Sequence, residues 1–418
     1  MVQECDKRVL PRTSAFTNEP NGVDERPWAI PMAFLFEILN PRREILKNIE
    51  VQTLNAGNKI SPPHYNPLPN GGEGKGEGTE QDGGVEKMDR IFSGIQPSGE
   101  IHIGNYVGAI RNWVQLVNRY DCIYCVVDYH AITIEYEVAS MQQRILETAT
   151  VLVACGLTPE RCKLFVQSHV PDHTELAWIF NSVTPVGELE RMTQFKEKGR
   201  QHRGNVNVGL LDYPVLQAAD ILIYKAGYVP VGEDQIQHVE FSREIARKFN
   251  ARFGDTFPEP KVILSDAPRI LGTDGSAKMS KSLNNAIGLL EPPETIWERL
   301  RTAATCEHRQ RRSDPGHPEH CNIFTMHQAF SKPDQIAFVD HNCRTAGFGC
   351  IDCKKILFEN MMEELAPIQN RVKEINEKPQ YMVDVLNSGA AKCKAIANEV
   401  MDEVRERIGV KSKWMSQR

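Results

Sequence analysis

Short apolar runs alternate with helical patterns from Ile91 to about Val231, and this alternation limits the possible folds more than any other feature. Residues 123–127 (Ile-Tyr-Cys-Val-Val) and 163–166 (Lys-Leu-Phe-Val) are apolar almost throughout, as in strands that are buried on both faces. Between them, residues 141–153 carry a helical pattern. Alternating strands and helices predict a parallel sheet, in a Rossmann-like α/β fold.

Two further apolar segments, 220–225 and 229–231, should continue this sheet. In open α/β sheets, ligands bind beyond the carboxyl ends of the strands. Three polar segments follow the expected strands at that edge, and they are residues 96–105, 128–130 and 232–235. We therefore expect a binding site to be assembled from these three segments.

The last third of the chain is helical in pattern. Apolar residues recur every three or four positions from Leu357 to Ile375 and again from Leu386 to Ile408, which predicts amphipathic helices packed into a bundle. Pro367 should kink or restart the first of them. We expect an α/β catalytic domain at residues 88–286, followed by an all-α domain at residues 287–418.

Residues 1–87 have a different composition. They include a Pro-rich run at 61–69 and a Gly-rich run at 70–78, and such a segment cannot bury enough apolar surface to fold. Its 13 acidic residues against 10 basic ones do not fit an acid-poor transit peptide. We expect a disordered extension without function, or a true start at Met88. No apolar run approaches the roughly 20 residues that span a membrane, so we expect a cytoplasmic protein.

Two short segments about 170 residues apart carry the chemistry. Residues 93–105 read Ser-Gly-Ile-Gln-Pro-Ser-Gly-Glu-Ile-His-Ile-Gly-Asn, which can end a strand, bring bare backbone against phosphates and open a helix. Residues 278–282 read Lys-Met-Ser-Lys-Ser, and two lysines three apart on a short loop can clamp the same anion. Together they predict a site for the phosphates of a nucleotide.

This pair of segments, with Gly232-Glu-Asp-Gln235, resembles the signatures of class I aminoacyl-tRNA synthetases, and residues 94–105 are similar to the tryptophanyl branch. The resemblance covers residues 88–418. It implies activation of L-tryptophan by ATP with Mg²⁺, transfer to the 3′ end of tRNA(Trp), and a homodimer. Activation joins a carboxylate to the α-phosphate and expels pyrophosphate, so the protein must hold two anions in line and neutralise charge.

The resemblance implies catalytic roles at the phosphates for His102, Lys198, Lys278 and Lys281. Lys198, with Lys196, could instead belong to a solvated charge cluster. The expected ATP-binding residues are Gln96, Pro97, Ser98, Gly104, Asn105, Gly232, Glu233, Asp234, Ile270, Lys278, Met279, Ser280, Lys281 and Ser282.

Tryptophan offers one specific polar group, the indole N–H, so its site needs one buried acceptor in an apolar slot. Asp220, flanked by Ala-Ala and Ile-Leu-Ile, resembles the indole acceptor of the family and needs a buried partner. Alternatively it caps a helix or pairs with a lysine. Gln217 stands where many relatives have methionine, and it either tunes the pocket or points away. The other expected tryptophan-binding residues are Tyr213, Val229, Val231 and Gln235, with Ile221 beside them.

Two rival functions remain open at this stage. A tyrosyl-specific enzyme of the same fold would need more than one polar partner for the substrate hydroxyl. A non-catalytic paralogue that binds RNA or senses an amino acid would not need the lysines and His102. The net charge of −6 gives no overall basic field, so tRNA must meet a local patch.

Four cysteines, Cys321, Cys343, Cys350 and Cys353, form a C-x21-C-x6-C-x2-C pattern. Four thiolates at such spacing can bind Zn²⁺ or a [4Fe–4S] cluster. The segment resembles a bacterial subgroup of tryptophanyl-tRNA synthetases that carries a [4Fe–4S] cluster, so we favour the cluster over zinc or no metal. The run 309–312 before it (Arg-Gln-Arg-Arg) is either a solvated face or a contact for tRNA phosphates. The other seven cysteines should be buried thiols.

Overall fold

A parallel five-stranded sheet organises the chain, as the alternating pattern predicted. The computed structural model describes residues 88–193, 206–265, 267–280 and 283–412, so the expectations for residues 1–87 lie outside the described residues. In these ranges the strands follow the order β3-β2-β1-β4-β5. Their bounds are β1 Arg90–Ile95, β2 Asp121–Val126, β3 Lys163–Val166, β4 Tyr228–Val231 and β5 Lys261–Leu264.

The strand order places a change of direction beside β1. The chain moves from β1 outward to β2 and β3, then returns to add β4 on the other side of β1. Pairing of β1 with β2 runs in parallel register from Arg90↔Asp121 to Ile95↔Val126. Because connections leave β1 and β4 in opposite directions, their carboxyl ends border a crevice, which is where ligands bind in open α/β sheets.

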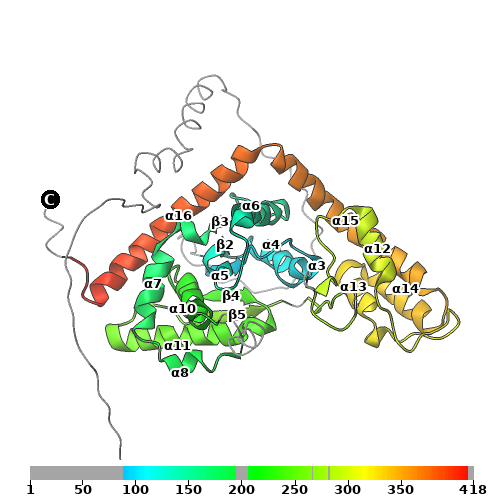
Figure 1. Cartoon of the computed structure of the whole chain (residues 1–418), viewed down its shortest axis with the longest axis horizontal. Coiled ribbons are helices and arrows are strands. Elements are labelled where there is room, and N and C mark those ends of the chain that lie inside the picture. Colours follow the sequence, from blue (N-terminus) through cyan, green and yellow to red (C-terminus); the bar gives the residue numbers. More distant parts are fainter. Residues whose placement is uncertain (1–87, 194–205, 266, 281–282, 413–418) are drawn as a thin grey trace, which may run out of the picture. The chain divides into compact units, whose positions relative to one another are not determined.

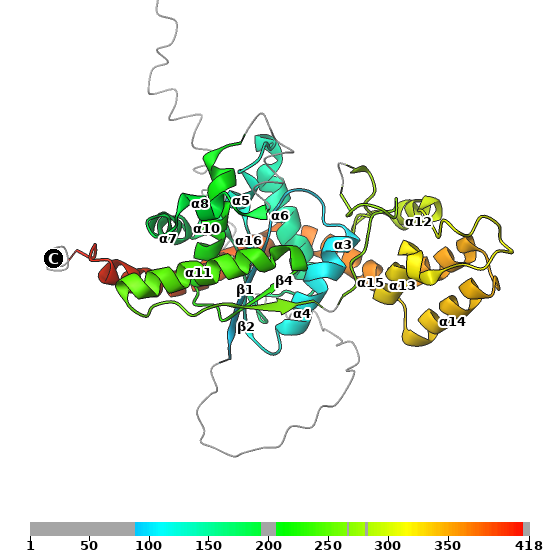
Figure 2. The same cartoon turned by 90° about the horizontal axis from the view of Figure 1, so that it is seen from below.

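Two apolar cores cover the two faces of the sheet. Along β2, Tyr124 and Val126 belong to one core and Ile123 and Cys125 to the other, because successive side chains of a strand point to opposite faces. Helices α4, α6 and α15 supply the first core, and helices α7, α10, α11 and α16 supply the second. Figures 1 and 2 show these helices around the sheet. Strands β1 to β4 are therefore largely buried between helical layers, whereas the edge strand β5 is partly exposed.

The described helices have the following bounds. They are α3 Ile103–Asn105, η1 Tyr106–Ile110, α4 Arg111–Leu116, α5 Asp128–Ala131, α6 Val138–Ala154, η2 Gln167–His169, α7 Asp172–Asn181, α8 Val186–Leu189, α10 Val208–Leu222, η3 Glu233–Gln235, α11 Ile236–Phe253, α12 Pro293–Thr302, η5 Pro318–His320, α13 Asn322–Phe330, α14 Pro333–Arg344, α15 Cys350–Asn376 and α16 Pro379–Arg407. None of those in the ranges above is both long and apolar enough to cross a membrane.

One expectation about the sheet is wrong. Residues 220–225 do not form a strand, because Asp220 lies in the last turn of helix α10, and the next strand is β4. The four residues from Ala219 to Leu222 are almost completely buried, and a helix that is buried all round shows the same continuous apolar run as a buried strand. The side chain of Asp220 is thus carried by a rigid helix.

The helical C-terminal region matches the predicted pattern, with one difference. Helix α15 continues through Pro367 from Cys350 to Asn376, so the expected restart does not occur. Helices α12 and α13 pack on α15, and α14 packs on α13 (Figure 2). Helix α16 returns to the sheet and packs on β3 so closely that a Cβ on Gly389 would lie 1.8 Å from the carbonyl oxygen of Leu164. The boundary between residues 286 and 287 stays a prediction.

Candidate active site

A cavity of about 1000 Å³ opens at the carboxyl ends of β1 and β4, the position that the strand order favours. Its wall comes from the segment after β1, the start of α5, helix α10, the end of β4 with η3, and the loop before residue 281. The predicted residues that line it are Gln96, Ser98, His102, Asn105, Tyr213, Gln217, Asp220, Val229, Val231, Asp234, Gln235, Lys278, Met279 and Ser280.

The remaining predicted residues divide into two groups. Pro97, Gly104, Gly232, Glu233 and Ile270 are described but are not part of the cavity wall. Lys198, Lys281 and Ser282 lie outside the described residues. The binding roles expected for both groups stay predictions.

The first signature segment pairs with residues 287–289, which follow the second signature segment along the chain. His102 and Gly288 form an antiparallel bridge, in which Ile103 N–H donates to the Ile287 carbonyl at 3.0 Å and Leu289 N–H to the Ile101 carbonyl at 2.9 Å. Backbone hydrogen bonds therefore fix the segment that follows the lysine loop against the segment that opens the first helix. A nucleotide at this edge would touch both segments.

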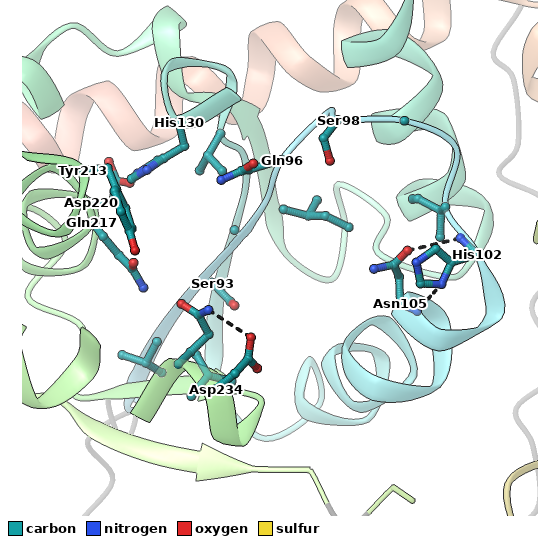
Figure 3. A pocket seen from close by; sticks show the side chains of 18 of the residues that line it. Ser93, Gln96, Ser98, His102, Asn105, His130, Tyr213, Gln217, Asp220 and Asp234 are labelled. Atoms are coloured by element: carbon teal, nitrogen blue, oxygen red, sulfur yellow. Dashed lines mark hydrogen bonds and ion pairs between the residues drawn. The ribbon is translucent and has the colours of Figure 1, made fainter. Parts of the chain in front are cut away.

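His102 and Asn105 cap the first helix reciprocally. Asn105 N–H donates to His102 Nδ1 at 3.3 Å, and His102 N–H donates to Asn105 Oδ1 at 3.2 Å. A neutral imidazole that accepts at Nδ1 carries its proton on Nε2, which is the kind of donor that a phosphate oxygen requires. Figure 3 shows both side chains at one end of the cavity.

Asn285 holds the lysine loop in shape, and sequence reasoning missed it. Its buried side chain accepts from Ser280 N–H at 2.8 Å and donates to Asp274 Oδ2 at 2.9 Å. A Cβ on Gly272 would lie 2.2 Å from Asn285 Nδ2, so only glycine fits there. A single asparagine in a polar loop shows no periodicity and no motif, so the sequence contained no signal for this role.

Lys278 extends from this ordered loop into solvent. Its side chain is 67% exposed, and its Nζ lies 3.9 Å from Asp234 Oδ2 across the cavity mouth. An exposed ion pair at this distance is worth at most about 1 kcal/mol, so an arriving phosphate can displace it. The described part of the loop is thus held at Ser280, while the Lys278 ammonium group stays available to an anion.

Asp220 lies at the opposite end of the cavity and is only 2% exposed. Its Oδ2 accepts from His130 Nε2 at 2.8 Å, and its Oδ1 accepts from His173 Nδ1 at 2.6 Å and from Gln167 Nε2 at 2.7 Å. Burial alone would raise the pKa of Asp220, but the hydrogen bonds from His130 and His173 outweigh it and lower the pKa below its usual value. The carboxylate is therefore ionised and buried.

These donors correct two alternatives for Asp220. It pairs with two histidines and a glutamine rather than with a lysine, and it lies in the last turn of a helix rather than at the N-cap. Sequence reasoning missed His173 and Gln167, which are 47 and 53 residues away. His130 had a weak signal, because residues 128–130 follow a predicted strand.

The wall around Asp220 is mostly apolar with a few polar groups. Apolar side chains come from Phe92, Val127, Ile134, Ile221, Val229 and Val231. Gln217 also lines the cavity, which answers whether it points inward (Figure 3). Tyr213 is buried, and its hydroxyl lies 2.8 Å from His238 Nε2. An acceptor at the end of such a slot suits a flat apolar ligand that carries one donor.

The four late cysteines lie in the helical region, outside the cavity wall. Burial raises the thiol pKa values of Cys321, Cys343 and Cys353, and each is raised further by neighbouring cysteines of the same set. The four side chains are therefore near one another. Nevertheless, within the described ranges no three His, Cys, Asp or Glu side chains are arranged to hold a metal ion.

Two buried cations border these cysteines. Arg309 is 8% exposed and donates to the Phe348 carbonyl at 2.6 Å, and Lys354 is 3% exposed and donates to the Ala303 carbonyl at 2.6 Å. Arg309 therefore departs from both interpretations of the run 309–312, whereas Gln310, Arg311 and Arg312 are exposed, so the choice between a solvated face and a tRNA contact stays open for them. The side chain of Arg312 remains 78% exposed.

Of the other seven cysteines, the six that the structure describes are buried and free, as expected. They are Cys122, Cys125, Cys155, Cys162, Cys306 and Cys393.

Comparisons of the sequence and of the fold with known proteins lead to the same family. The profile of the family described as "tRNA synthetases class I (W and Y)" matches residues 86–366. The curated tryptophan–tRNA ligase of Deinococcus radiodurans is 53% identical, over 77% of this chain and 99% of its own length, and that of Thermotoga maritima is 44% identical over the same shares. A solved tryptophanyl-tRNA synthetase from Campylobacter jejuni, complexed with ADP and tryptophan, is 35% identical with a TM-score of 0.69, over 77% of this chain and 99% of that one.

Proposed function

This chain belongs to the class I tRNA synthetases of the tryptophan and tyrosine family, and from that premise we propose that it is a tryptophan–tRNA ligase. It activates L-tryptophan with ATP to tryptophanyl-adenylate and transfers the acyl group to the 3′ end of tRNA(Trp). Residues 88–286 form the catalytic domain and the helices of 287–418 bind the anticodon region. As a translation enzyme it acts in the cytoplasm. The main structural support for this proposal is the cavity, which has Asp220 at one end and the signature residues at the other.

The reaction needs alignment and charge neutralisation rather than a covalent intermediate. The tryptophan carboxylate attacks the α-phosphorus of ATP, and the bond to pyrophosphate breaks on the opposite side. His102 and Asn105 donate to phosphate oxygens, while Lys278, Lys281 and Lys198 neutralise the charge that moves onto pyrophosphate. Mg²⁺ accompanies ATP as part of the substrate.

Selection of tryptophan over tyrosine rests on the buried end of the cavity. The Asp220 carboxylate can only accept a hydrogen bond, which suits the indole N–H, whereas a phenol both donates and accepts. His130 already donates to Asp220, so its N–H is not available to a phenol oxygen. Besides Asp220, helix α10 contributes Tyr213 and Gln217 to the cavity wall.

The test is amino-acid-dependent ATP–pyrophosphate exchange on the purified full chain. Exchange with tryptophan that exceeds exchange with tyrosine by about 10³-fold or more supports the proposal, since a site built around one polar group rejects analogues strongly. Equal or greater activity with tyrosine would identify a tyrosyl enzyme. No exchange with either amino acid would favour a non-catalytic paralogue.

We further propose that Cys321, Cys343, Cys350 and Cys353 hold a [4Fe–4S] cluster. Repulsion among the neighbouring thiolates would be relieved by a metal centre, and Arg309 and Lys354 offset the charge of four thiolates. The preference for a cluster over zinc rests on the resemblance of the C-x21-C-x6-C-x2-C pattern to the cluster-carrying subgroup.

The metal content of protein purified without oxygen tests this proposal. We expect a brown protein with about four irons per chain, and loss of iron in Cys353→Ser. Cys162→Ser is the matched control and should keep its iron, because it removes a buried thiol of the core beside the sheet, outside the set. Stoichiometric zinc would establish the alternative, and metal-free protein with full charging activity would exclude both.

A homodimer is the expected assembly, and we propose that the surface around Trp178 on α7 takes part in it. Trp178 is the most exposed of the large apolar side chains that the structure describes, at 78%. Sedimentation should give a dimer for the wild type and a monomer for Trp178→Glu. A dimeric variant would show that this surface is not the interface.

A further inference from the structure

We propose that His173 is a positioning residue for tryptophan selection, which fixes one oxygen of Asp220 so that the other oxygen receives the substrate N–H. The inference rests on the proposed role of Asp220 as the indole acceptor, and it extends that role to residues outside the cavity. His173 and Gln167 do not line the cavity, whereas Asp220 and His130 do. His173 therefore acts through Asp220 and not by touching the substrate.

The two oxygens of Asp220 have different surroundings. Oδ1 accepts from both His173 Nδ1 and Gln167 Nε2, at 2.6 and 2.7 Å, and both of these donor residues are completely buried. Oδ2 accepts from His130 Nε2 at 2.8 Å, its one hydrogen bond among the described residues. Since each carboxylate oxygen offers about two acceptor sites, Oδ1 is saturated and Oδ2 retains one site. That site belongs to a side chain of the cavity wall.

A second hydrogen bond fixes the orientation of each donor on Oδ1. Tyr129 N–H donates to Gln167 Oε1 at 3.2 Å, so the Gln167 amide must turn its NH₂ group toward Asp220. His173 Nε2 lies 2.7 Å from the hydroxyl of Tyr224. Burial raises the pKa of Tyr224 well above its usual value, so this hydroxyl stays protonated and can donate.

These contacts assign one proton arrangement to the chain of groups. The Tyr224 hydroxyl donates to His173 Nε2, and a neutral His173 that accepts at Nε2 carries its proton on Nδ1. Nδ1–H then donates to the ionised Asp220, which can only accept. Every group in this buried chain has a partner of the correct kind, which holds the carboxylate in one rotation.

The rotation matters because a carboxylate that can turn offers its free acceptor site in several directions. With Oδ1 anchored by two buried donors, Oδ2 alone can meet a substrate, and it does so at one angle. A site that holds its acceptor rigidly gains more discrimination against ligands without the donor. The aromatic rings of Phe165 and Tyr224 lie 5.7 and 5.4 Å from the His173 ring, so its own position is also fixed by packing.

The experiment compares tryptophan with β-(3-benzothienyl)alanine, in which sulfur replaces the indole N–H. The readout is the ratio of kcat/KM for the two substrates in pyrophosphate exchange. His173→Phe keeps an aromatic ring and removes both hydrogen bonds, and we expect the ratio to fall about 10-fold or more. The KM for ATP and activity with the thienyl analogue should change by less than about 3-fold, whereas a merely structural defect would reduce both substrates equally.

His173→Asn is the rescue variant, because its amide can place an N–H close to the position of Nδ1. Its ratio should return to within about 3-fold of wild type. A folded His173→Phe enzyme with the wild-type ratio overturns the proposal. If that variant does not fold, Tyr224→Phe replaces it, since it removes only the hydroxyl that orients His173, and an unchanged ratio there overturns the proposal equally.

Asp220→Leu separates this inference from the proposed function. If Asp220→Leu loses discrimination and His173→Phe does not, only the positioning role fails. If Asp220→Leu keeps the wild-type ratio, the assignment of Asp220 as indole acceptor fails and the positioning role fails with it.

Discussion

The two ends of the cavity differ in burial and in hydrogen bonding, and each end suits a different part of the substrates. At one end the side chain of Asp220 is 2% exposed and receives hydrogen bonds from three buried side chains. At the other end the side chain of Lys278 is 67% exposed and faces Asp234 at 3.9 Å. One end is thus buried and fixed by hydrogen bonds, whereas the other presents an exposed cation. Figure 3 shows Asp220 at one end of the cavity and the helix-capping pair His102 and Asn105 at the other.

The chemistry of the ligands explains the difference. An indole N–H is a single neutral donor. A site selects for it when the acceptor would otherwise be left without a hydrogen bond, and this costs free energy only if the acceptor is buried. A triphosphate carries several charges, arrives hydrated and must leave as pyrophosphate. Solvated cations attract it over distance and release it again, so strong fixation before binding would bring no advantage there.

The largest expected effect comes from removing the buried acceptor. Asp220→Leu should lower kcat/KM for tryptophan by about 10³-fold, because His130, His173 and Gln167 lose their partner as well as the substrate. The KM for ATP should change little, because most of the predicted ATP-binding residues that line the cavity lie away from Asp220. Pyrophosphate exchange at varied tryptophan and varied ATP measures both quantities.

Asp212→Asn is the matched control for this variant. Asp212 lies on the same helix, bonds to Asn181 at 2.9 Å and does not line the cavity. It should leave both constants within about 2-fold of wild type, as surface changes usually do. If Asp220→Leu and Asp212→Asn change kcat/KM for tryptophan equally, the buried end does not select tryptophan through Asp220.

A smaller effect is expected at the exposed end. Lys278→Ala and Lys281→Ala should each slow adenylate formation by about 10²-fold, since one donor to transition-state charge is worth roughly 3 kcal/mol. The fold should be unaffected, because the Lys278 side chain is largely in solvent. Single-turnover formation of adenylate at saturating tryptophan measures this step.

Lys332→Ala provides a control with similar exposure, 69% for its side chain, and with an ion pair to Glu363 instead of a place in the cavity. It should react at the wild-type rate. Wild-type rates for both signature lysine variants would remove the phosphate clamp from the mechanism.

Loss of the cysteine cluster should affect tRNA charging without disturbing either end of the cavity. Cys353→Ser is expected to lower aminoacylation of tRNA about 10-fold while pyrophosphate exchange changes by less than about 3-fold, because lost metal ligation loosens the helical region that meets tRNA. Charging and exchange measured on the same preparation give the two values. An equal loss in both assays would place the cluster in communication with the cavity.

The parts of the site that sequence predicted differ in kind from those it missed. Residues 93–105 and 278–282 are recognisable because glycine, lysine and histidine are dense within one short segment. His173 and Gln167 contact Asp220 from segments about 50 residues away, and Asn285 contacts the nearby Asp274 and Ser280. No motif in their local sequence marks these three residues. Residues 220–222, the end of helix α10, were predicted as part of a strand because complete burial removes the periodicity that distinguishes helices from strands.

The smallest effect is expected from a chain that begins at Met88. Every residue of both cavity ends that the structure describes lies at or after Phe92, and both apolar cores begin at Ile91 and Phe92. The curated relatives from Deinococcus radiodurans and Thermotoga maritima are matched over 99% of their length by 77% of this chain. Residues 1–87 are rich in Pro and Gly and show no pattern of apolar residues that could form a core.

The truncated enzyme should therefore keep both kinetic constants for tryptophan and for ATP within about 2-fold of the full chain, and its Tm within about 2 °C. Exchange kinetics and thermal unfolding of the two proteins, measured side by side, check this expectation. A selective loss of tryptophan use would mean that the extension supports the buried end, and a selective loss of ATP use would mean that it serves the exposed end. Either result would show that one end of the cavity depends on residues 1–87, which belong to neither end as described above.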